Sequence, residues 1–288
     1  MDEQVWLATR FEEYRGHLRA VAYRMLGSLA EADDAVQEAW LRLHRTGESA
    51  IDNLGGWLTT VVGRVCLDML RTRASRREEP AGPHLPDPVV GTDPEQQALL
   101  ADSVGMALLV VLDTLDPAER LAFVLHDMFG LPFDEIAPVV GRSSVATRQL
   151  ASRARRRVQG SPTTPDTSLD RQHRVVDAFF AAARDGDFDA LVAVLDPDVV
   201  LRAEGGALPA GASRVLHGAA AVANHALLFR STGPGPGVNR PVVVNGAAGM
   251  LVSRDGRPAV LFAFTVQNDH IATIEVISDP ERLADLSG

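Results

Sequence analysis

The sequence predicts a multidomain chain in which two small all-α domains precede a C-terminal α+β domain. Its 288 residues exceed the length of a typical single domain. Apolar residues recur at helical spacing through residues 5–48, 54–73 and 95–159, whereas short β-rich runs separated by turns follow residue 199. Helices that come first and strands that follow favour an α+β unit at the end of the chain.

The first domain is expected at residues 1–75 and should contain three helices. Gly27-Ser28-Leu29 interrupts the helical pattern of the first 48 residues, so we expect two helices there. A third helix is expected from Leu54 to Arg73, after a loop that begins at Thr46.

Residues 76–94 are expected to form a linker, because they contain five prolines and two glycines. The second all-α domain is then expected at residues 95–160. Within it, a short helix from Phe133, a turn at Gly141 and a longer second helix have the form of a helix-turn-helix.

The third domain is expected at residues 169–288, after a polar stretch rich in proline. Two helices, at Arg171–Arg184 and Phe188–Leu195, should precede its strands. The expected strands are Val199–Arg202, Val242–Val244, Met250–Ser253, Val260–Val266 and Ile271–Ile277.

The charge is distributed very unevenly along the chain. The net charge is −10, which taken alone argues against a nucleic-acid partner. Residues 142–157, however, hold six arginines and no acid, and residues 61–77 hold five arginines and one acid. Two basic islands in an acidic chain point to two local nucleic-acid contacts.

The first basic island lies on the second helix of the helix-turn-helix. At 100° per residue, Leu150 and Ala154 face inward, whereas Ser144, Arg148, Ser152 and Arg155 face outward and are free to enter a major groove. Ser143 is the expected N-cap. The residues expected to bind DNA are Ser143, Ser144, Val145, Arg148, Ser152, Arg153, Arg155 and Arg156. An ordinary helical hairpin with a solvated basic end is the alternative.

The second basic island lies on the helix that begins at Leu54. An aromatic and basic face after a loop suits the capture of an unstacked base from opened DNA. The residues expected on this face are Asn53, Trp57, Thr60, Arg64 and Arg71. Periodicity alone favours a core position for Trp57, so both interpretations stay open.

These motifs resemble a known family in order and in content. Tyr23-Arg24-Met25-Leu26-Gly27-Ser28 and Ala32-Asp33-Asp34-Ala35-Val36-Gln37-Glu38-Ala39-Trp40-Leu41-Arg42 are similar to the second conserved region of the extracytoplasmic-function sigma factors of bacterial RNA polymerase. Gly56-Trp57-Leu58-Thr59-Thr60-Val61-Val62-Gly63-Arg64-Val65-Cys66-Leu67-Asp68 resembles the part of that region that reads the −10 element. Leu115-Asp116-Pro117-Ala118-Glu119-Arg120 and the helix-turn-helix resemble the fourth region, which reads the −35 element.

The resemblance implies a sigma factor that binds core RNA polymerase and directs promoter-specific transcription initiation. The residues implied to dock on the polymerase clamp helices are Asp33, Asp34, Gln37, Glu38 and Leu41. Without the flanking motifs this stripe would be an ordinary amphipathic surface. Two other classes of protein are the alternatives: a helix-turn-helix regulator with a small-ligand-binding domain, and an enzyme with a DNA-binding appendage.

The linker and the chain end narrow the resemblance to the subgroup with a fused SnoaL-like (NTF2-like) domain, which is a cone-shaped α+β fold. The subgroup's Trp-Leu-Pro-Glu-Pro is here His84-Leu85-Pro86-Asp87-Pro88, its Asp-Gly-Gly-Gly-Lys-Val is Glu204-Gly205-Gly206-Ala207-Leu208-Pro209, and its Asn-Pro-Asp-Lys-Leu is Asp279-Pro280-Glu281-Arg282-Leu283. We expect the domain to regulate in cis. The implied regulatory contact comprises Leu85, Pro86, Asp87, Pro88, Glu204, Gly205, Gly206, Asp279, Pro280 and Glu281.

Several other functions are not indicated by the sequence. Asp198, His217, His225, Asp255 and His270 form no pair whose spacing demands catalysis, so we expect no enzyme. Scattered histidines and the single Cys66 indicate neither a metal nor another cofactor. No membrane span or signal peptide is visible, which favours a cytoplasmic protein. The sequence leaves open whether the C-terminal domain binds a small ligand.

Overall fold

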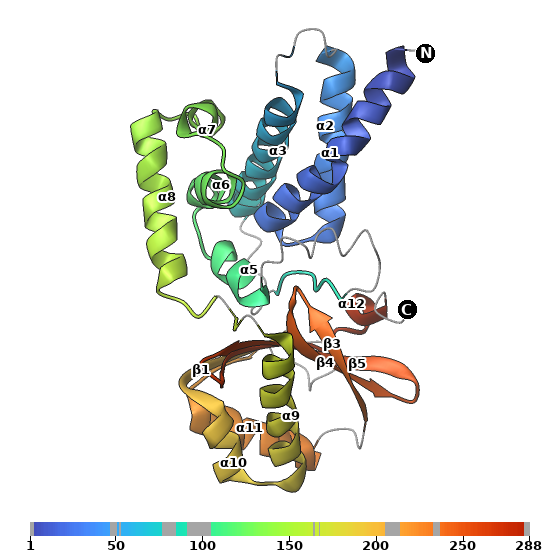
Figure 1. The fold of residues 1–288 in the computed structure, drawn as a ribbon, viewed down its shortest axis with the longest axis vertical. Helices are drawn as coiled ribbons and strands as arrows, with labels where there is room; N and C mark the ends of the chain where they lie inside the picture. Colours follow the sequence, from blue (N-terminus) through green and yellow to red (C-terminus); the bar gives the residue numbers. More distant parts are fainter. Residues whose placement is uncertain are drawn as a thin grey trace. The chain divides into compact units, whose positions relative to one another are not determined.

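The computed structural model describes residues 3–46, 51, 53–76, 85–90, 105–163, 165–166, 168–204, 214–232 and 237–284. The chain forms two compact units (Figure 1). Unit 1 comprises Met1–Glu78, Gln97–Asp102 and Leu109–Ser161, and unit 2 comprises Glu79–Gln96, Ser103–Leu108 and Pro162–Gly288.

Unit 1 begins with the three helices expected from the sequence. They are α1 (Glu3–Leu26), α2 (Leu29–Thr46) and α3 (Leu54–Arg76). Gly27 separates α1 from α2 with a φ of +73°, a conformation that glycine adopts without steric cost. Leu18, Met25, Leu43 and Leu58 are fully buried and form part of the core among the three helices.

The helix-turn-helix is also confirmed. α5 (Met106–Asp113), α6 (Pro117–Phe123) and the π-helix η2 (Val124–Met128) lead into α7 (Phe133–Val140) and α8 (Ser144–Gln159). Gly141 ends α7 in the left-handed conformation, and Ser143 caps α8 by accepting a hydrogen bond from the Ala146 amide.

The two helical regions of unit 1 pack against each other. A Cβ atom on Gly63 of α3 would lie 3.1 Å from methyl groups of Leu121 and Leu125, so glycine allows this close approach. Arg120 of α6 is buried; its Nε donates to the Arg24 carbonyl of α1 (3.2 Å) and its Nη1 to Asp113 (2.9 Å). Unit 1 is therefore a single closed body.

Unit 2 is an α+β domain, as expected. Its elements are α9 (Leu169–Asp185), α10 (Phe188–Val194), β1 (Leu195–Glu204), β2 (Arg214–His217), α11 (Ala219–Thr232), β3 (Val238–Val244), β4 (Ala247–Arg254), β5 (Arg257–Gln267), β6 (His270–Ile277) and α12 (Pro280–Ala284). The strand order is β2-β1-β6-β5-β4-β3, and β1 runs parallel to β6 while the other pairs are antiparallel.

Helices α9, α10 and α11 form one core with the sheet. Val176, Phe179, Leu191 and Val222 of these helices share a buried cluster with Phe264 of β5. The strands are longer than the sequence analysis expected, and β2 and α12 were not expected at all. β2 is exposed along most of its length and α12 has five residues, so neither carries a strong apolar pattern.

Strand β6 places a carboxyl group on the sheet face opposite this core. Side chains alternate along a strand, and Glu275 lies between Ile274 and Val276 of the core cluster. Glu275 is fully buried and its carboxylate contacts Arg202 Nη1 (3.4 Å) and Thr273 Oγ1 (3.1 Å). Burial raises the pKa of Glu275 to about 7, against the lowering effect of Arg202.

We expect Glu275→Gln to remove a pH dependence from the stability of unit 2. The folded pKa of about 7 exceeds the ordinary value of 4.5, so the protonated carboxyl stabilises the fold below pH 4.5 and this contribution is lost as the pH rises through 7. The loss amounts to at most about 3 kcal/mol. The loss is measured by urea unfolding at pH 5 and at pH 8, with amide exchange in β5 and β6 as the probe.

The control is Asp255→Asn, which changes an exposed carboxyl group in a turn with positive φ that asparagine tolerates. It should leave the pH profile unchanged. An equal decline in stability from pH 5 to pH 8 in wild type and Glu275→Gln would contradict the assignment to this carboxyl group.

Candidate nucleic-acid interfaces and linker contact

The outer face of α8 presents the residues expected to read base edges. Val145 is 64% exposed and Arg148 is exposed, while Leu150 and Ala154 on the other side of the helix are buried. The Arg148 guanidinium lies 5.4 Å from the centre of the Phe133 ring, a cation–π contact that orients it. Ser144 donates to Asp134 of α7.

One arginine of α8 that was expected to lie free on the outer face is bound to an acidic side chain, and a neighbouring arginine is bound in the same way. Arg155 does not lie free on the outer face, because its Nε (2.8 Å) and Nη2 both contact the Asp127 carboxylate. Arg153 Nε donates to Glu119 at 2.5 Å. Ser152 and Arg156 are exposed. Periodicity gives the face of a helix, but the acidic partners come from α6 and η2 and depend on tertiary packing.

A groove between α2 and α3 contains most of the second expected interface. Trp57, Thr60, Val61 and Arg64 of α3 line it opposite Arg42, and its volume is about 560 Å³. Trp57 is half-buried in the groove wall, so its exposure is intermediate between that of a core residue and that of an open surface for base capture. The remaining lining residues are Glu38, Arg45 and Thr46.

Two residues expected beside this groove have other positions. The Asn53 side chain caps α3 by accepting a hydrogen bond from the Gly56 amide at 3.1 Å. Arg71 is exposed two turns further along α3 and does not line the groove.

The expected polymerase-docking residues share one surface of α2. Asp33, Asp34, Gln37 and Leu41 are exposed, and Leu41 is one of the large exposed apolar side chains of the chain's described part. Glu38 is half-buried and forms an ion pair with Arg42 at 2.8 Å. Arg19 of α1 holds Asp33 at 2.7 Å. An exposed leucine flanked by acids is suited to a protein partner.

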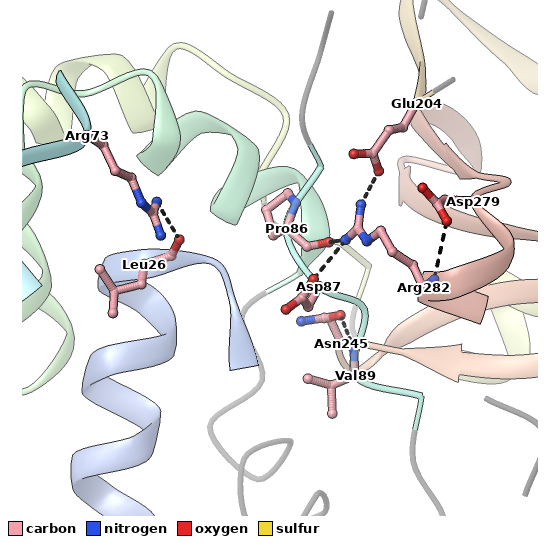
Figure 2. A network of polar contacts seen from close by, with 9 residues as sticks. All are labelled: Leu26, Arg73, Pro86, Asp87, Val89, Glu204, Asn245, Asp279 and Arg282. Atoms are coloured by element: carbon pink, nitrogen blue, oxygen red, sulfur yellow. Dashed lines mark hydrogen bonds and ion pairs between the residues drawn. The ribbon is translucent and has the colours of Figure 1, made fainter. Parts of the chain in front are cut away.

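Arg282 of α12 binds the linker within unit 2 (Figure 2). Its Nη2 donates to the Pro86 carbonyl (2.8 Å) and to the Asp87 carboxylate (3.1 Å), and its Nη1 forms an ion pair with Glu204 at the end of β1. The Arg282 side chain is 16% exposed. Asp279 caps the short helix by accepting from the Glu281 amide (2.8 Å), which fixes the position of Arg282.

The linker also pairs with the edge of the sheet. Asn245 lies in the turn after β3. Its side-chain Oδ1 accepts a hydrogen bond from the Val89 backbone amide (3.0 Å), and its backbone amide donates to the Val89 carbonyl (2.9 Å). Val90 forms an isolated antiparallel bridge with Val244. Leu85 is fully buried and Val89 is 2% exposed. The segment 85–90, which we call the docked linker, thus occupies the position of an added edge strand.

The Arg282 contact includes Pro86, Asp87 and Glu204 of the set predicted from the sequence, and its regulatory role stays a prediction. Pro86 and Pro88 are buried, Pro280 begins α12 and Glu281 is exposed. Gly205 and Gly206 lie outside the described residues. Arg282, Asn245 and Val89 were not selected as site residues; Arg282 stood in the quoted chain-end motif, whereas nothing local marks Asn245.

Comparisons with known proteins identify the family of the two helical regions. The Sigma-70 region 2 family matches residues 10–76, and the Sigma-70, region 4 family matches residues 105–158. These ranges hold the α2–α3 groove and the helix-turn-helix. The chain belongs to the ECF RNA polymerase sigma factors, because it is 40% identical to a member of that family over 95% of its length.

Within this family, the chain is similar to the ECF RNA polymerase sigma factor SigJ of Mycobacterium tuberculosis. The two are 40% identical over 95% of this chain and 92% of the relative. The crystal structure of SigJ covers 96% of this chain and 98% of its own, with a TM-score of 0.76 and 37% identity. The probable sigma factor SigI of the same organism is 42% identical over 73% of this chain and 74% of its own length.

The chain is therefore a sigma factor that directs transcription initiation, with core RNA polymerase and promoter DNA as its partners. This family assignment replaces the alternatives of a helix-turn-helix regulator with a ligand-binding domain and of an enzyme with a DNA-binding appendage. Among the helices that the structure describes, none has the length and apolar character needed to cross a membrane.

We expect Asn245→Gly to free the docked linker without disturbing the turn. Asn245 has a φ of +49°, which glycine adopts readily, and the substitution removes the Oδ1 acceptor of the Val89 amide. The loss of one hydrogen bond should speed exchange of that amide by roughly five- to tenfold. Hydrogen exchange of a peptide covering residues 85–90 measures it.

Asn268→Gly is the matched control, since Asn268 has a φ of +50° in the turn between β5 and β6. It should leave exchange at Val89 unchanged. An unaltered Val89 amide in Asn245→Gly would show that Asn245 does not hold the linker in solution.

Proposed function

We propose that the C-terminal domain controls the sigma factor in cis by holding the linker that joins its two DNA-reading regions. The observation that carries this proposal is the grip of Arg282 on Pro86 and Asp87, together with the pairing of Asn245 with Val89. The linker connects region 2 to region 4, so a segment fixed on unit 2 restricts how far those regions can separate.

The size of a promoter explains why such a restriction inhibits. The −10 and −35 elements lie about 25 base pairs apart, or roughly 85 Å along B-DNA. In the closed unit 1, α3 of region 2 touches α6 of region 4, with Gly63 beside Leu121. Both regions can reach their elements together only after this unit opens, and opening needs a free linker.

Region 4 is proposed to read the −35 element with the exposed start of α8. Val145 and Arg148 are the proposed base contacts, with Ser144 beside them, and Ser143 directs the positive end of the helix towards a phosphate. Arg156 and Ser152 are proposed backbone contacts. Arg153 and Arg155 would have to leave Glu119 and Asp127 to reach phosphate, so we assign them a smaller share.

Region 2 is proposed to hold an unstacked base of the −10 element in the α2–α3 groove. Trp57 supplies an aromatic surface for stacking and Arg64 a charge for the backbone, with Thr60 between them. Asn53 contributes by capping the start of α3, and Arg71 is proposed to contact DNA two turns beyond Arg64 on the same helix. The exposed α2 stripe of Asp33, Asp34, Gln37, Glu38 and Leu41 is the proposed surface for the clamp helices.

We further propose that the C-terminal domain regulates and does not catalyse. The apolar cavity of unit 2 offers His225 and Ser278 as its polar groups. The carboxyl group of Glu275 lies on the other face of the sheet, where it could not work with them as an acid–base pair.

We expect Arg148→Ala and Arg156→Ala to weaken promoter use in different ways. A lost base contact should cost about 1–3 kcal/mol on a native −35 element and little on a scrambled one. Arg156→Ala should weaken both templates equally and flatten the salt dependence by about one unit. Holoenzyme binding to the two templates across a salt series measures both, and equal losses for Arg148→Ala on both would contradict base reading.

We expect Arg282→Ala to raise transcription by the holoenzyme. A charge-assisted contact is worth about 1.5–3 kcal/mol, so its loss should free the linker roughly 10- to 150-fold more often. A chain that ends at Ile277, without α12, should behave like Arg282→Ala. A chain that ends at Gln159 has no surface that holds the linker, so its activity should be at least as high as that of the Ile277 chain.

The measurement is in vitro transcription at equal polymerase saturation, and Arg257→Ala is the control because it removes an exposed arginine at the start of β5. That control should match wild type. Activity that is the same in the full chain, Arg282→Ala and both truncated chains would refute control in cis by this contact.

A further inference from the structure

Unit 2 encloses an apolar cavity that its part in holding the linker does not require. The cavity lies between α9, α11 and strands β1, β5 and β6, and has a volume of about 100 Å³. Four aromatic rings line it: Phe179, Phe180, Phe229 and Phe262. Phe180 and Phe262 meet in a T-shaped contact, with their ring centres 5.4 Å apart.

Two polar side chains reach this apolar space. His225 of α11 is half-buried, and burial, with a contribution from the Arg214 guanidinium, lowers the pKa of its imidazole. The ring is therefore neutral at physiological pH and carries one donor and one acceptor. Ser278 is 1% exposed and its hydroxyl donates to the Glu204 carbonyl at 3.2 Å.

We propose that this cavity binds an uncharged, single-ring molecule with one hydroxyl group, of the phenol class. An apolar cavity of roughly 150 Å³ in another protein accommodates benzene, so one ring that extends into the mouth matches the space here. Four phenylalanine rings in the lining favour an aromatic ring, and His225 can pair with one hydroxyl. Among the described residues that line the cavity, none carries a full charge, so an ionised ligand would be buried without a partner.

The cavity is connected to the linker contact by a short series of hydrogen bonds. Ser278 lines the cavity and donates to the Glu204 carbonyl; the Glu204 carboxylate pairs with Arg282, and Arg282 holds Pro86 and Asp87. Figure 2 shows the part of this series from Glu204 to the linker. A ligand that moves Ser278 therefore changes the contact between Glu204 and Arg282. The release of the linker then depends on whether the ligand is bound. This step rests on the proposed function.

Phenol binding to the full chain, without polymerase or DNA, tests the site. Isothermal titration should give saturable binding at roughly 0.1–1 mM, and phenol should raise the melting temperature. Ala226→Leu puts three carbons into the cavity and should weaken binding more than tenfold. Ala221→Leu makes the same change on an exposed position of α11 and should bind phenol as wild type does.

Two further arms test the chemistry of the ligand. His225→Leu should weaken phenol about tenfold and leave toluene unchanged, because only phenol has a hydroxyl to pair with the imidazole. Benzoate, which has the same ring and a charge, should not bind. Circular dichroism and melting curves establish that each variant is folded. No saturable binding of phenol by wild type, equal binding by Ala226→Leu, or tighter binding of benzoate would overturn the proposed site.

Hydrogen exchange tests the connection to the linker separately. Saturating phenol should change the exchange rate of the Val89 amide in wild type, and should not do so in Ser278→Ala, which lacks the hydroxyl that contacts Glu204. Bound phenol with no change at Val89 would refute the connection. Because these assays contain no polymerase, their failure leaves the transcription tests of linker control unaffected.

Discussion

The half-buried guanidinium of Arg282 is the interaction on which the organisation of unit 2 depends. A cation removed from water must be satisfied by acceptors, and here they come from two segments far apart in sequence: the docked linker and the end of β1. The linker supplies two of these acceptors. Seating α12 and docking the linker are therefore one event, because neither leaves Arg282 satisfied without the other.

Much of the fold could be predicted from the sequence because its determinants are local. Gly27 and Gly141 adopt positive φ where two helices end, Ser143 caps α8, and the apolar spacing of α1–α3 marks a buried face. The contacts between the linker and unit 2, and the acidic partners of the α8 arginines, could not be predicted in this way. Asn245 and Val89 are 156 residues apart, and Arg155 meets Asp127 through packing that no periodicity encodes. Local patterns give the face of a helix; tertiary packing gives the partner.

Departures from the subgroup's linker and chain-end motifs now have a physical interpretation. Asp87 replaces a glutamate and Arg282 replaces a lysine, so the opposite charges are kept and meet at 3.1 Å. Arginine does more than preserve the charge, since its planar fork reaches Glu204, the Pro86 carbonyl and Asp87 together, whereas an ammonium group presents a single point of charge. Leu85, fully buried, supplies the apolar anchor of the docked linker.

Strand β6 joins the separate features of unit 2 through the alternation of its side chains. Ile274 and Val276 face the cavity, Glu275 faces the opposite side, and Ser278 follows at the end that leads to α12. A shift of this strand cannot alter the cavity alone, because the same backbone carries the buried carboxyl group and the start of the helix that grips the linker. A ligand in this cavity would lie against the strand that leads to the helix holding the linker, which is the physical basis of the proposed connection.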